Sequence, residues 1–131
     1  MIIYKPYSLT KTIGVEYNAC IENSKEDWVV LMDIDTTFLT PTQPLLIAKA
    51  IKEYGNSNVG MFVCKTNRVG YRQHLLHRQR SNDPDFTEHI KIAKRLEAEE
   101  FSVSKAHRQC SGFFMCVNKK AWEEIGGFKR S

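Results

Sequence analysis

The chain has 131 residues, of which 42% are hydrophobic and 26% charged, and its formal net charge is +4. This composition is typical of one soluble domain with a buried core, and it excludes a disordered chain. The positive charge favours anionic ligands but is too small to indicate nucleic-acid binding by itself. No apolar run reaches the length of a membrane span and the amino terminus lacks the segments of a signal peptide, so we expect a cytoplasmic protein.

A short strand and a helix are predicted first along the chain. Residues 2–4 are apolar and rich in strand-forming types, and Pro6 ends that strand. Ser8 or Thr10 can cap the helix that follows, which is expected to end near residues 23–24. The apolar positions of one helix face are Ile13, Tyr17, Cys20 and Ile21.

A continuous apolar run, Trp-Val-Val-Leu-Met at residues 28–32, predicts a buried strand in the centre of a sheet. Asp33, Ile34 and Asp35 follow directly. Because side chains alternate between the two faces of a strand, we expect both aspartates to point the same way, about 7 Å apart, and Ile34 to point into the core.

The two aspartates are candidate metal ligands. Mg²⁺ and Mn²⁺ are usually held by one or two carboxylates together with substrate phosphates, and ligands of open α/β sheets bind at the carboxyl ends of the strands. The alternative is that Asp33 and Asp35 only form a turn, without a ligand.

The middle of the chain predicts a helix from about residue 42 to Gly55, a strand at residues 59–65 and a helix that opens at Pro84. Arg68, at the exit of the strand, is a candidate contact for a diphosphate or a sugar because its guanidinium offers a planar fork of donors. The alternative is a solvated loop residue. The basic segment at residues 71–85 could cover donor phosphates, contact nucleic acid or form a charged surface loop.

Residues 113–117 predict the last strand, and residues 119–125 a short helix that two glycines end. Gly112, before the strand, lets backbone approach a ligand closely. Trp122, in the helix, either packs in the core or offers a platform to a sugar. The four cysteines form no Cys-x-x-Cys pair and indicate free thiols.

Three of these stretches together resemble the GT-A glycosyltransferases, in particular the family 2 type that uses nucleotide-diphosphate sugars. They are the Gly-x-x-x-Asn pattern that begins at Gly14, the Asp-Ile-Asp followed by Phe-Leu-Thr-Pro, and residues 111–128, which end in Trp-Glu-Glu-Ile-Gly-Gly-Phe. The resemblance covers most of the chain. It implies one GT-A-like α/β domain over residues 1–131, a three-layer sandwich with helices on both faces of a mostly parallel sheet, incomplete relative to the full family.

The resemblance also implies a function, the metal-dependent transfer of a sugar from a nucleotide-diphosphate donor to a hydroxyl of a carbohydrate or other acceptor. Asp33 and Asp35 are then expected to hold Mn²⁺ or Mg²⁺. The expected nucleotide-sugar-binding residues are Asp33, Asp35, Asn18 and Arg68, and those on the acceptor side are Gly112 and Trp122. No residue matches the acidic catalytic base of the family, so the catalytic residue is unknown.

Two alternatives remain open. The chain could bind a nucleotide sugar without turnover, or need a partner chain, such as a second copy, to complete its site. It could instead be a basic nucleic-acid-binding module, which the small net charge disfavours. Metal-dependent nucleotide binding would support a donor site, and turnover would distinguish an enzyme from a binding subunit. Binding to generic DNA or RNA that weakens steeply with salt concentration would support the nucleic-acid-binding module.

Overall fold

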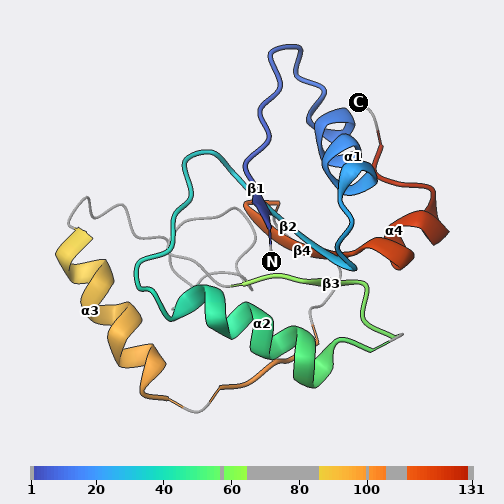
Figure 1. Ribbon diagram of the computed structural model, residues 1–131. Helices are drawn as coiled ribbons and strands as arrows, with labels where there is room; N and C mark the ends of the chain where they lie inside the picture. Colours follow the sequence, from blue (N-terminus) through green and yellow to red (C-terminus); the bar gives the residue numbers. More distant parts are fainter. Residues whose placement is uncertain (1, 57, 65–85, 100, 106–111, 130–131) are drawn as a thin grey trace. The chain divides into compact units, whose positions relative to one another are not determined.

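The structure of the protein is a computed structural model that describes residues 2–56, 58–64, 86–99, 101–105 and 112–129 (Figure 1). These residues are mixed α/β, with one four-stranded sheet and four helices. They belong to two compact units. The first unit comprises Met1–Thr36, Gly55–Cys64 and Gly112–Ser131, and the second comprises Thr37–Tyr54 and Lys65–Ser111.

The first unit contains the sheet, whose strands lie in the order β1-β2-β4-β3 (Figure 1). The strands are β1 (Ile3–Tyr4), β2 (Trp28–Met32), β3 (Met61–Phe62) and β4 (Phe114–Asn118). β1 pairs parallel with β2, and β4 pairs antiparallel with β2 and with β3. Three strands therefore run one way, but the single reversed strand lies between two of them. Only the β1–β2 pairing is parallel, so the sheet of the described residues is mixed and corrects the predicted mostly parallel sheet.

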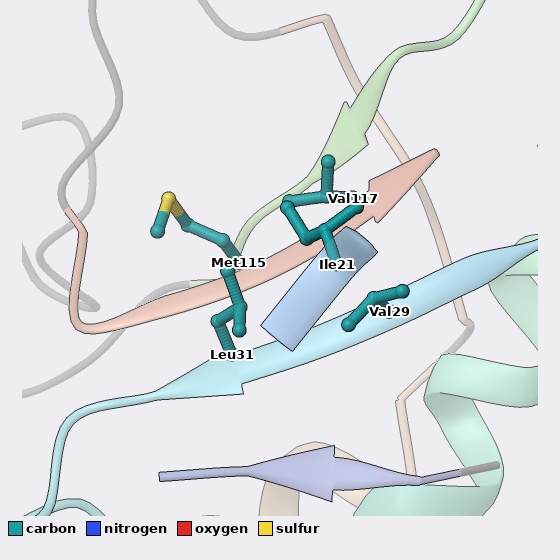
Figure 2. Packing of buried hydrophobic residues seen from close by; sticks show 5 residues of the cluster. All are labelled: Ile21, Val29, Leu31, Met115 and Val117. Carbon is teal, nitrogen blue, oxygen red and sulfur yellow. The ribbon is translucent and has the colours of Figure 1, made fainter. Parts of the chain in front are cut away.

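The core of this unit lies on one face of β2 and β4 (Figure 2). Val29 is paired with Val117 and Leu31 with Met115 across the two strands, and Ile21 from the helix α1 (Ile13–Asn23) joins them. Val29, Leu31 and Ile21 are fully buried. The alternate β2 residues, Val30 and Met32, are buried as well, which confirms the central strand predicted from its continuous apolar run.

The helix α1 connects the parallel strands β1 and β2, and both of its ends are held by contacts outside the helix. Near its start, the Ser8 hydroxyl accepts a hydrogen bond from the Thr12 amide at 2.9 Å, and Thr12 is the N-cap residue. At its end, the Lys119 ammonium donates to the carbonyls of Ser24 at 2.6 Å and Glu22 at 3.3 Å. A cation there satisfies carbonyls that a helix terminus leaves unpaired. The helix ends at the predicted residue, but the role of Lys119 was not predicted.

The helix α4 (Lys119–Ile125) has the predicted bounds because its end signals are local. The Asn118 side chain accepts a hydrogen bond from the Ala121 amide at 2.9 Å and so caps the first turn. At the other end, Gly126 adopts the left-handed conformation with φ of 82°, which glycine allows without steric cost.

The second unit contains the helices α2 (Gln43–Tyr54) and α3 (Phe86–Glu97). Hydroxyls of Thr40 and Thr42, at the start of α2, both donate to the carboxylate of Glu97 at the end of α3. Phe101 packs against Tyr54, with ring centroids 6.4 Å apart, and the Lys49 ammonium lies 4.8 Å from the centre of the Phe101 ring. Both helices were predicted from their apolar faces.

Other parts of the sequence prediction differ from the structure or stay predictions. Strand β3 is shorter than the predicted 59–65, because only its two residues pair with β4. The three-layer GT-A-like sandwich and the single domain over residues 1–131 stay predictions. Across the described ranges, no helix combines the length and apolar character that crossing a membrane requires.

Candidate functional site

Asp33 and Asp35 lie in a turn at the carboxyl end of β2. The strand ends at Met32, and the Asp33 amide donates to the carbonyl of Phe113 at 2.9 Å, just before β4 begins. The Thr36 amide then donates to the Asp33 carbonyl at 3.0 Å, which closes the turn. The site is thus positioned by the pairing of β2 with β4.

This turn corrects the predicted direction of Ile34. The alternation of side chains, which predicted that Ile34 points into the core, applies only within a strand. Because the chain turns after Asp33, the Ile34 side chain is 62% exposed instead. The same alternation of side chains predicted that Asp33 and Asp35 share one face of the strand. Because both residues lie in the turn, that prediction does not apply to them.

The two carboxylates nevertheless influence each other. Burial, and secondarily the negative charge of Asp35, raise the pKa of Asp33 above its ordinary value. Asp35 is exposed and Asp33 partly buried. Two carboxylates whose charges repel each other are stabilised by a bound cation, and oxygen donors of this type suit Mg²⁺ and Mn²⁺. The residues present therefore fit a divalent metal.

The raised pKa of Asp33 predicts a pH-dependent effect of Asp33→Asn. The folded protein holds the Asp33 proton more tightly than the unfolded chain, so ionised Asp33 lowers the free energy of unfolding at neutral pH. We expect Asp33→Asn to be more stable than the wild type at pH 7. This advantage should disappear as the pH falls below about 3.8, the ordinary pKa, where the carboxyl is protonated in both states.

Urea unfolding of the two proteins between pH 3 and pH 7 measures this difference. Asp27→Asn is the matched control, because Asp27 is an exposed carboxylate at the other end of β2. An Asp33→Asn variant that is less stable than the wild type at pH 7 would show that the carboxylate stabilises the fold.

An open pocket of about 350 Å³ is lined in part by Gly112, the residue before Phe113, whose carbonyl accepts the hydrogen bond from the Asp33 amide. Its walls come from the start of α1, from the beginning of β4 and from the segment after α4. The lining residues are Ile13, Gly14, Tyr17, Gly112, Met115, Phe128 and Lys129. Tyr17 links the pocket to the aspartates, because burial, and secondarily the charge of Asp33, raise the pKa of its hydroxyl.

Asn18 connects the helix α1 to the segment after α4. Its Oδ1 accepts hydrogen bonds from Nε1 of Trp122 at 2.9 Å and from the Phe128 amide at 2.8 Å. Its Nδ2 donates to the Phe128 carbonyl at 2.9 Å. These contacts give Asn18 a structural role, and its predicted contact with a nucleotide stays a prediction.

The other predicted site residues are distributed as follows. Gly112 lines the pocket, whereas Trp122 packs against the core cluster and hydrogen-bonds to Asn18. Arg68 and the basic segment at residues 71–85 lie outside the described residues. Within the described ranges, no group of three or more His, Cys, Asp or Glu side chains could hold a metal ion, so the candidate metal site consists of two carboxylates.

From the sequence, Tyr17 was predicted only as part of an apolar helix face. Lys129 and Met115 were not predicted to line a pocket. The signal for Tyr17 was its position next to Asn18, within the Gly-x-x-x-Asn pattern. Met115 is buried like its neighbours in β4, and no local pattern marks it as a pocket residue.

Comparisons of the chain with protein-family models, with curated proteins and with solved structures found no match.

Proposed function

We propose that the chain binds a nucleotide-diphosphate sugar at the carboxyl end of β2 and transfers the sugar to an acceptor hydroxyl. One observation carries the proposal: residues 14–21, 33–36 and 112–128, which belong to the three stretches that resemble GT-A glycosyltransferases, lie in one unit, and the last of them is hydrogen-bonded to each of the other two. The Asp33 amide donates to the Phe113 carbonyl, and Asn18 is bonded to Trp122 and Phe128. Segments that are 80 to 110 residues apart in sequence are thus joined in one unit.

Asp33 and Asp35 are the residues that would hold the metal. When bound, Mn²⁺ or Mg²⁺ would neutralise charge on the departing diphosphate. Burial, and secondarily the charge of Asp35, raise the pKa of Asp33, and this supports the assignment because a cation would relieve the repulsion between the two carboxylates. The backbone of the turn that bears both residues is held by the hydrogen bond from the Asp33 amide to the Phe113 carbonyl.

In the proposed reaction, the bond between the sugar anomeric carbon and the diphosphate oxygen breaks, and a bond from that carbon to the acceptor oxygen forms. The nucleoside diphosphate leaves with the bonding electrons. The acceptor hydroxyl gives up its proton to a general base, a role to which we assign no residue of this chain.

Calorimetric titration with UDP and with GDP, each in the presence and absence of Mn²⁺, tests the donor site. We expect one of the nucleotides to bind the wild type, and Mn²⁺ to strengthen that binding at least tenfold. The double variant Asp33→Asn/Asp35→Asn should lose this gain, because it removes both carboxylates that would hold the metal.

The matched control is Glu22→Gln/Glu26→Gln, which removes two exposed carboxylates elsewhere in the same unit and so changes the net charge by the same amount. It should bind like the wild type. If a folded wild type binds neither nucleotide with Mn²⁺, the donor-site proposal is wrong. If binding occurs but no donor sugar is released to any acceptor or to water, the chain is a binding subunit and not a complete transferase.

A further inference from the structure

The pocket beside Asp33 is mainly apolar. Ile13, Met115 and Phe128 contribute side chains without a hydrogen-bonding group, and the ring of Tyr17 packs edge-on against Phe128, with centroids 5.8 Å apart. The pocket has a volume of about 350 Å³ and is wide open to solvent, so it would cover one side of a small group. Such a surface gains free energy by burying an apolar group and gives few partners to a polar one.

Two glycines form part of the pocket wall. Gly112 is exposed, and a methyl group built at its Cα would meet no atom within 4 Å. The packing of the protein therefore does not require glycine at this position. Gly14 lies inside α1, where glycine is less favourable than alanine. Because Gly112 lines the pocket and has open space at the Cβ position, we expect a larger side chain there to take up part of the space that a ligand would occupy.

The side chains that bring polar groups to the pocket are few. The Tyr17 hydroxyl is close enough to Asp33 to be influenced by its charge, and Lys129 contributes a cation. A nucleobase carries several donors and acceptors on its edges, which the apolar side chains would leave without partners. A molecule with one apolar part and one polar end suits this arrangement better.

We propose that this pocket holds the apolar part of the acceptor, an aromatic or alkyl group that is attached to the hydroxyl-bearing part. The inference rests on the proposed function, because it takes the carboxyl end of β2 as the donor site. The acceptor hydroxyl then lies at the Gly112 side of the pocket, next to Phe113 and the turn that bears Asp33, while the apolar group contacts Met115 and Phe128.

The test compares phenyl β-D-glucoside with methyl β-D-glucoside, which share the sugar and differ in the apolar group. Binding is measured by ¹⁵N NMR titration without nucleotide or metal, so it does not depend on the donor site. We expect the phenyl compound to bind at least fivefold more tightly than the methyl compound, with the largest shifts at the amides of Gly14 and Gly112.

Gly112→Val should weaken binding of the phenyl compound at least fivefold while its unfolding midpoint stays that of the wild type. If the Gly112→Val variant does not fold, the smaller substitution Gly112→Ala takes its place in the same binding measurement. The control is Gly60→Ala, because a methyl group there makes only an ordinary contact, 3.5 Å from the Ala121 side chain, away from the pocket. It should not change binding.

Equal affinity for the two glucosides, or an unchanged affinity in a folded Gly112→Val or Gly112→Ala variant, would overturn the inference. So would a Gly112 variant that loses UDP binding in Mn²⁺ but retains the phenyl compound, because the pocket would then hold the donor. If wild type binds the phenyl compound in the pocket but neither UDP nor GDP, the proposed function fails and the preference of the pocket for an apolar ligand stands.

Discussion

Replacing Asn18 by alanine is expected to lower the free energy of unfolding by about 3 kcal/mol, from the loss of three hydrogen bonds at roughly 1 kcal/mol each. The Asn18 side chain accepts from Trp122 Nε1 and the Phe128 amide, and it donates to the Phe128 carbonyl. These groups are partly buried, and alanine would leave them without their partner. The effect should be large because one side chain joins α1 to a segment more than a hundred residues away.

Urea unfolding monitored by circular dichroism measures this loss, with Asn23→Ala as the matched control. Asn23 is the exposed last residue of α1, so its replacement by alanine should change the free energy of unfolding by less than about 0.5 kcal/mol. Asn18→Asp keeps the acceptor but loses the donor to the Phe128 carbonyl, so an intermediate loss is expected. An Asn18→Ala variant as stable as the wild type, but unable to bind nucleotide, would assign Asn18 to the ligand instead.

Gly127→Ala is expected to destabilise the protein by about 2 to 3 kcal/mol, for two separable reasons. Gly127 has a φ of +86°, a left-handed conformation that costs a residue with a side chain about 1 kcal/mol or more. In addition, a Cβ atom at this position would lie 3.0 Å from Oδ1 of Asn18. The side chain of Asn18 cannot retreat without weakening its bonds to Trp122 and Phe128.

Gly126→Ala separates these two contributions. Gly126 has a similar φ of +82°, but a Cβ atom there would meet nothing within 4 Å. It should therefore lose only the conformational part, about 1 kcal/mol. The difference between the two variants in thermal or urea unfolding measures the steric contact with Asn18. Equal losses for Gly126→Ala and Gly127→Ala would show that this contact costs nothing.

The elements that the sequence predicted correctly are those with local signals. The apolar run of β2 predicted a strand with the observed bounds, Trp28–Met32, and the short helix before two glycines was predicted with the bounds of α4, Lys119–Ile125. Strand β3 was predicted too long, because its pairing with β4 determines its length and no local pattern records that pairing.

The direction of the side chains at the site depended on contacts that are distant in sequence. Ile34 was expected in the core, but the bond from Asp33 to Phe113 marks the end of the strand and the chain turns there. The partners of Asn18 are 104 and 110 residues away, so helix periodicity could not predict them. The hydrogen bonds of residues 112–128 to Asp33 and to Asn18 are likewise contacts that no local pattern predicts.

The measurement that tests the donor site most directly is paramagnetic broadening of ¹⁵N NMR signals by a small amount of Mn²⁺ in the presence of UDP or GDP. We expect the strongest broadening at the amides of the turn from Asp33 to Thr36 and at Phe113, whose carbonyl is bonded to Asp33. Asp33→Asn/Asp35→Asn should abolish it, and Glu22→Gln/Glu26→Gln should not. Broadening centred on another part of the chain, or broadening that persists in the aspartate double variant, would contradict the assignment of Asp33 and Asp35 as the metal ligands.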